Sequence, residues 1–118
     1  MKRDDDFMRE MLFEAEGACE PFLVAPLTKD EDHDEIKRYL HAKWLCDAGF
    51  FFEINEGVFR MTNQGHDFLV AIRDDTRWNR TKNIASGVGG LTLDIMKGVA
   101  VGLLKQKLME IGVQIDNG

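Results

Sequence analysis

Residues 34–73 read DEIKRYLHAKWLCDAGFFFEINEGVFRMTNQGHDFLVAIR, and this stretch decides the fold. Apolar residues recur at helical spacing from Asp34 to Ala48, which predicts a helix capped by Asp32 or Asp34. Gly49 follows where a left-handed helix C-cap belongs. The first element of the stretch is therefore predicted to be a helix that ends at a glycine.

A hairpin and a second helix are predicted next. Two short apolar runs, residues 50–54 and 58–61, flank the turn Asn55-Glu56-Gly57, which predicts two strands joined by a tight loop. Thr62 predicts the N-cap of a helix that runs to about Asn79. A helix, a wing-like hairpin and a helix in this order are typical of a winged helix-turn-helix.

The segment before this stretch predicts one helix and one edge strand. Apolar residues at helical spacing start at Phe7, and the helix is expected to end near Gly17. Prolines bracket residues 21–26, which restricts them to a short edge strand. Residues 28–34 are almost wholly polar where a winged helix has its second helix, so that helix is expected to be a single turn or missing.

The predicted fold class is α+β and mostly helical: a reduced winged helix-turn-helix with an extra C-terminal helix. The winged-helix-like domain is expected to span residues 1–83. Residues 84–92 contain the glycine-rich stretch of the chain and predict a hinge. Residues 93–112 predict an amphipathic helix capped by Thr92, either part of the same domain or a dimerisation arm.

Composition limits the classes of function. The net charge of −6 and the pI of about 5.0 disfavour general phosphate coating, because non-specific DNA binding needs a local basic face. Cys19 and Cys46 lie too far apart for a metal knuckle and are expected to be reduced, buried thiols. Residues 1–6 turn acidic before a signal core can form, so a cytoplasmic location is expected.

The helix predicted from Asp34 has two apolar stripes rather than one. The first consists of Tyr39, Ala42, Leu45 and Cys46, and the second of Ile36, Leu40 and Trp44. Only a narrow strip between them is plainly polar. Because a helix with two apolar flanks is usually covered on both, the C-terminal helix is the expected second cover.

The basic residues of this helix are candidate DNA contacts, because a winged helix touches bases and phosphates there. They are Lys37, Arg38, His41 and Lys43. Acidic neighbours surround them, so a solvated helix face is the alternative. A second candidate surface, for DNA backbone or an acidic partner, is an arginine stripe on the next predicted helix, with a solvated helix end as its alternative. The stripe consists of Arg73, Arg77 and Arg80.

Four motifs were weighed as catalytic or ligand sites, and a structural role is favoured for each. No spacing joins His66-Asp67 to further metal ligands. The adjacent carboxylates of Asp74-Asp75 diverge by about 100 degrees on a helix. Gly87–Gly90 lacks the lysine and hydroxyl residue of a phosphate loop, and Cys46 lies on an apolar stripe. The sequence therefore predicts no enzyme, no metal and no cofactor.

The last predicted helix is the candidate for self-association. Its apolar stripe is too broad for a helix alone in water, and Lys97 and Lys105 leave too short an apolar run to cross a membrane. Two alternatives stay open: the helix folds back over the second apolar stripe of the central helix, or it pairs with its copy in a homodimer. The candidate oligomerisation residues are Ile95, Gly98, Val99, Gly102, Leu103 and Leu108.

The hydrophobic core is expected to join the inward stripe of each element. Each predicted member lies on such a stripe or begins the wing. The predicted core residues are Phe7, Met11, Leu12, Leu45, Phe50, Phe68, Leu69 and Ile72.

Three motifs carry a resemblance to a known family. The most specific is TNQGHDFLVAIRDDTRWN at residues 62–79; residues 1–4, MKRD, also match, as does His41 with the helix end at residues 45–49. On these motifs the chain resembles a family of short, uncharacterised phage and prophage proteins that carry only a domain-of-unknown-function label. The resemblance covers nearly the whole chain. It implies a winged-helix-like fold and a mobile-element origin but no activity, and the wing here is shorter than the family leads us to expect.

Two functions follow as hypotheses. The first is a small winged-helix transcriptional regulator that touches the major groove of double-stranded DNA with the basic residues of the central helix. The second is an accessory or anti-defence factor that binds a host or phage protein through the same scaffold without binding DNA. Fold analogy favours the first, whereas the acidic pI and the doubly apolar central helix favour the second.

Overall fold

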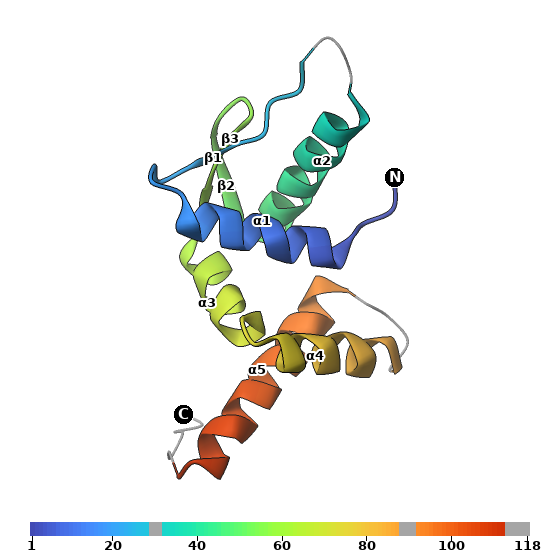
Figure 1. Ribbon diagram of the computed structural model, residues 1–118, viewed down its shortest axis with the longest axis vertical. Coiled ribbons are helices and arrows are strands. Elements are labelled where there is room, and N and C mark those ends of the chain that lie inside the picture. The colour runs from blue at the N-terminus through green and yellow to red at the C-terminus, as the bar shows by residue number, and fades with distance from the viewer. Residues whose placement is uncertain (29–31, 88–91, 113–118) are drawn as a thin grey trace. The chain divides into compact units, whose positions relative to one another are not determined.

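The computed structural model describes residues 1–28, 32–87 and 92–112, arranged in two units, Met1–Leu69 and Val70–Gly118 (Figure 1). It is mostly helical with one antiparallel sheet, which confirms the α+β class. The elements in chain order are α1 (Asp5–Gly17), β1 (Leu23–Val24), α2 (His33–Asp47), β2 (Phe51–Asn55), β3 (Val58–Met61), α3 (Asn63–Ile72), α4 (Asp75–Gly87) and α5 (Leu93–Glu110).

Helix α1 begins and ends where its sequence predicts. The Asp4 carboxylate accepts a hydrogen bond from the Phe7 N–H at 3.0 Å and caps the helix, which ends at Gly17. Met8, Met11 and Leu12 are its buried residues. The apolar stripe of this helix thus faces the core, and Figure 1 shows α1 lying across α2.

Helix α2 is also bounded by the predicted caps. The Asp32 side chain accepts from the Asp34 N–H, and Gly49 adopts a φ of +82° after the last turn. The Phe50 N–H then bonds the Leu45 carbonyl at 2.9 Å, which turns the chain directly into β2. No further helix lies between β1 and α2 in the described residues 25–28 and 32, consistent with a reduced helical segment.

The sheet has the strand order β1-β3-β2, with both pairings antiparallel. The short strand β1 lies at an edge, as its flanking prolines predict. Phe59 of β3 is fully buried and pairs with Leu23 on one side and Glu53 on the other, so this face of the sheet is the inner one. Gly57 closes the hairpin with a φ of +73°.

Thr62 caps α3 and ties it to the end of α2. Its hydroxyl accepts from the Gly65 N–H at 3.1 Å and donates to the Gly49 carbonyl at 2.5 Å. Gly65 is buried against the backbone of Phe50, where a Cβ would clash with the Phe50 carbonyl oxygen. The glycine is therefore required for the close approach of α3 to the start of β2.

The prediction of one long helix from Thr62 to about Asn79 is wrong. The helix ends at Ile72, and a second helix begins at Asp75. The Asp74 carboxylate accepts from the Arg77 N–H at 2.8 Å and caps the new helix. The predicted hinge also begins too early, since α4 continues through residues 84–87. The remainder of the glycine-rich stretch, residues 88–91, lies outside the described residues.

Seven of the eight predicted core residues are buried, and that they share one cluster stays a prediction. Phe7 is only half-buried, whereas the other seven predicted residues are buried. The Phe50 and Phe68 rings stack with centroids 4.5 Å apart, which joins the hairpin to α3. The sequence did not identify Met8, Leu23, Phe51 and Phe59 as further core residues of the first unit.

In the second unit α5 packs against α4. Trp78, Thr81 and Ala85 are buried on α4, and Met96 and Ala100 are buried on α5. Thr92 caps α5 through the Ile95 N–H at 3.1 Å, as predicted, and Gly112 follows the helix end with a φ of +87°. Within the described ranges, no helix is long and apolar enough to span a bilayer.

Candidate interaction surfaces

The basic side chains of α2 are held by carboxylates of the same unit. Lys37 Nζ lies 3.2 Å from an oxygen of Asp4 and 4.5 Å from the centre of the Phe7 ring. Lys43 Nζ donates to Glu53 at 2.7 Å. This bond raises the pKa of Lys43, and together with the Gly57 N–H it lowers the pKa of Glu53.

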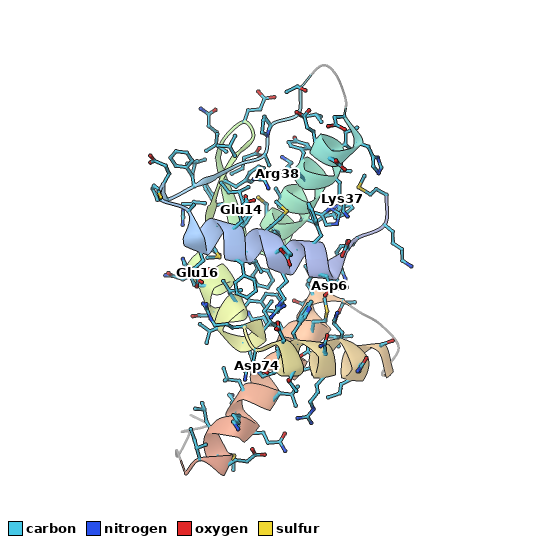
Figure 2. All side chains as sticks on the ribbon, in the orientation of Figure 1. Asp6, Glu14, Glu16, Lys37, Arg38 and Asp74 are labelled. Atoms are coloured by element: carbon cyan, nitrogen blue, oxygen red, sulfur yellow. The ribbon has the colours of Figure 1, made fainter. Side chains whose placement is uncertain are left out.

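Arg38 makes the most extensive of these contacts (Figure 2). Its two terminal nitrogens donate to the two oxygens of Glu14 at 2.9 and 2.5 Å, a bidentate pair between α2 and α1. The same guanidinium donates to the Val24 carbonyl at 2.9 Å. Arg38 thus joins α1, β1 and α2, and its donors are already occupied by groups of the first unit.

His41 is buried, which corrects its prediction as a DNA contact on the polar strip. Its Nε2 accepts from the Asp4 N–H at 2.9 Å, so the ring proton lies on Nδ1, which donates to the Lys37 carbonyl at 2.7 Å. Phe7 and Trp44 approach the ring edge-to-face, with centroids 5.0 and 4.8 Å away. Burial lowers the pKa of His41 and keeps the imidazole neutral.

Helical phase could have identified this buried histidine. His41 lies beside Ala42 and four residues before Leu45, and these two are the other buried residues of α2. The exposed residues of the helix and its cap lie at the two ends, and three of the four in the described range 32–47 are acidic. They are Asp32, His33, Asp34 and Asp47.

The arginine stripe predicted on one helix is divided by the break between α3 and α4. Arg73 lies between the two helices rather than on either. Arg77 donates through Nε to the Ala71 carbonyl at 2.5 Å, and this bond gives a partner to one of the carbonyls at the C-terminal end of α3. Arg80 lines a groove of about 310 Å³ between α4 and α5, opposite Leu103 and Lys107 of α5. The prediction that the three arginines share one face of one helix is therefore wrong.

Apolar side chains gather on the outer face of the sheet. Val24 pairs with Val58 and Phe52 pairs with Arg60, so these residues share the face opposite the buried Phe59. Val24 is 48% exposed and Phe52 is 53% exposed, and the Arg60 guanidinium lies 5.2 Å from the Phe52 ring centre. Ile54, at an irregularity of β2, is 48% exposed. This outer sheet face, Val24, Phe52, Ile54 and Val58, was not identified from the sequence.

The candidate oligomerisation residues lie on α5 with different degrees of exposure. Gly98 and Gly102 are exposed, and a Cβ at either position would meet nothing within 4 Å. The four apolar candidates on the helix are half-buried; they are Ile95, Val99, Leu103 and Leu108. The neighbour of α5 in its own unit is α4, and the predicted packing over the second stripe of the central helix stays a prediction.

The described motifs with candidate catalytic side chains belong to different elements. His66 and Asp67 are exposed on α3, and Asp74 serves as the cap of α4. Cys46 is half-buried, and burial raises the pKa of its thiol to about 11, which keeps it protonated and unreactive at neutral pH. Cys19 is exposed, so the prediction that it is buried is wrong. Among the residues that the structure describes, no three His, Cys, Asp or Glu side chains are grouped to hold a metal ion.

Comparisons with known proteins identify the family of the chain. The family model described as hypothetical protein (DUF2513) matches residues 2–92. An uncharacterized protein of Haemophilus influenzae (strain Rd) is 32% identical over 119 residues, which cover 92% of this chain and 99% of that protein. No solved structure matches the chain. The chain therefore belongs to the DUF2513 family.

Proposed function

We propose that this chain is a protein-binding accessory factor of a phage or prophage, acting in the cytoplasm, that uses a reduced winged-helix scaffold without reading DNA through α2. The order of α1, β1, α2 and the β2–β3 hairpin supports the winged-helix interpretation, as does the central position of β3 in the sheet. The mobile-element origin rests on the sequence resemblance. The binding mode rests on the charges of α2.

One observation carries the proposal: the basic residues of α2 are already paired within the first unit. A side-chain nitrogen lies within 3.2 Å of a carboxylate oxygen in each of the three residues Lys37, Arg38 and Lys43. A phosphate contact would have to replace these ion pairs, so it would gain little of the counterion-release free energy that drives DNA binding. With His41 buried, none of the four predicted DNA contacts on α2 is available without breaking an internal interaction.

The outer sheet face offers a more suitable surface for a protein partner. Three large apolar side chains on one small sheet are each about half exposed. Grouped apolar exposure of this kind is typical of protein interaction sites. Phe52, on the edge strand β2, has the character of an interface anchor, because aromatic side chains provide much of the binding free energy at interfaces.

A DNA-binding assay separates the two functions. Pooled DNA duplexes are incubated with the protein at about 50 mM and 200 mM salt, a range over which phosphate contacts lose affinity steeply. We expect no duplex to be retained at either concentration. Retention at the lower salt that is lost at the higher salt would contradict the proposal and support the transcriptional regulator.

A matched pair of variants tests the protein-binding surface. The double variant Phe52→Ser/Ile54→Ser removes apolar side chains from the outer sheet face, and Val70→Ser removes a similarly exposed one, 50% exposed, from α3. A partner captured by cross-linking in host cells is purified, and its affinity for each variant is measured by calorimetry. We expect the double variant to lose at least about tenfold in affinity, as expected for loss of an aromatic anchor, and Val70→Ser to bind normally. Equal binding by both variants would overturn this site.

A further inference from the structure

Helix α5 has apolar residues around most of its circumference, and it packs against α4 on one side within its unit. Met96 and Ala100 are its buried residues, whereas Met109 remains 68% exposed. Met109 and the half-buried Ile95 and Val99 leave apolar surface on α5 that α4 does not cover. Exposed apolar surface of this kind is typical of interaction sites.

Helical spacing assembles the open side of α5 into one face. Asp94, Gly98, Lys105 and Met109 are separated by four, seven and four residues, and these spacings place them along one line of the helix; all four are exposed. Ile95, Val99 and Gly102 border this line on one side and add apolar surface, with the first two half-buried. We call these seven residues the α5 ridge.

Charge on the α5 ridge is self-complementary. The midpoint between Gly98 and Gly102 and the midpoint between Asp94 and Lys105 both fall at about residue 100. A twofold axis through this point would therefore bring each glycine close to the other glycine of a second copy. The same axis would bring each Asp94 close to Lys105 of the second copy.

We propose that the α5 ridge pairs with the α5 ridge of a second copy of this chain, antiparallel and across a twofold axis near residue 100. The exposed glycines allow the two backbones to approach closely, which offers a reason for two residues that otherwise disfavour a helix. In an antiparallel pair the positive end of each helix dipole lies beside the negative end of the other, which is electrostatically favourable. A parallel pair would instead place Asp94 against Asp94 and Lys105 against Lys105. This pairing is independent of the outer sheet face and of the function proposed above.

Charge reversal in the full-length protein tests the direction of pairing. Sedimentation velocity measures the dimer dissociation constant of Asp94→Lys, Lys105→Glu and the double exchange. Each single reversal puts two like charges together twice in the antiparallel dimer, so we expect at least about a tenfold weaker dimer for each, in the range of close like-charge contacts at interfaces. The double exchange should restore the affinity of the unchanged protein.

The matched control is Lys107→Glu, which makes the same charge change on the same helix but in the groove facing α4. This variant should dimerise normally. In a parallel pair each substituted residue would meet the same residue of the second copy, so like charges would meet both before and after the substitution. Unaltered affinity in both single variants would therefore overturn the antiparallel arrangement. A chain that stays monomeric at all concentrations would overturn the pairing altogether and favour packing of α5 on its own chain.

Gly98→Leu separates assembly from folding. The space around this glycine is open within the chain, so the monomer should accommodate leucine and unfold at no lower temperature. Close approach of the second helix would be blocked, and the dimer should be lost. A Gly98→Leu protein that dimerises as strongly as the unchanged chain would contradict a crossing at this residue.

Discussion

At the scale of single residues, Asp4 and His41 form the connection between α1 and α2. Asp4 caps α1 with one carboxylate oxygen, pairs with Lys37 through the other, and donates its N–H to His41. The cap from the Phe7 N–H is the largest cause of the lowered pKa of Asp4. Because the His41 ring is buried and accepts at Nε2, a proton added at that atom would displace the bond from Asp4.

Acid should destabilise the protein through His41. Its pKa in the folded state lies below the ordinary value of 6.5, so the unfolded chain binds a proton first as the pH falls. The contribution of neutral His41 to the free energy of unfolding is constant above about pH 6.5. Below this pH the free energy of unfolding falls as the pH decreases toward the folded-state pKa. Chemical denaturation from pH 7.5 to 5 should show this decline, and His41→Gln should reduce it. An equal decline in both proteins would contradict the assignment.

Gly65 should not tolerate a side chain. A Cβ there would clash with the Phe50 carbonyl oxygen and lie 2.7 Å from Met61 Cγ, and the backbone atom cannot move aside cheaply. We expect Gly65→Ala to lower the free energy of unfolding by about 1–3 kcal/mol, the usual cost of overpacking. Gly17→Ala is the control, because a Cβ at Gly17 would meet nothing within 4 Å. Denaturant midpoints for the two variants would measure the difference.

At the scale of elements, the break between α3 and α4 depends on one side chain at each end. Asp74 caps the start of α4, and Arg77 donates to carbonyls at the end of α3. A helix interrupted in this way changes direction, so side chains on the two sides of the break do not share one helical face. The arginine stripe fails for this reason.

Removing the cap of α4 should destabilise the second unit. Asp74→Ala leaves the Arg77 N–H without its partner, and we expect a loss of about 1 kcal/mol in the free energy of unfolding. Asp74→Ser provides a hydroxyl that can accept the same bond and should recover most of the loss. Thermal unfolding of the two variants makes the comparison. Equal stability of the alanine and serine variants would show that the cap contributes little.

At the scale of the whole molecule, stability depends on a small core. Leu45 is fully buried at the centre of the first unit, and Leu45→Ala should cost about 2–5 kcal/mol. This is a large part of the roughly 5–15 kcal/mol that stabilises a domain. Leu27→Ala, at a position that is 51% exposed, should change little. An unmoved denaturation midpoint for Leu45→Ala would contradict the observed burial.

Local sequence signals predict where most elements begin and end. Gly49, Thr62 and Thr92 were each identified correctly as helix boundaries, Asp32 is the one of the two predicted caps that begins α2, and the hairpin turn ends at Gly57 as predicted. These signals are readable because a cap or a tight turn depends on backbone groups within about four residues. The apolar stripes located most of the core for a similar reason, since helical spacing is itself a local property.

The partners of the polar residues depend on how the elements pack together. Arg38 meets Glu14, 24 residues earlier, and Lys37 meets Asp4, 33 residues earlier. The sequence shows these charges but not their pairing, because ion pairs form between elements whose approach depends on packing of the core. The burial of His41 and the apolar outer face of the sheet were decided in the same way, by which side of each element its neighbours cover.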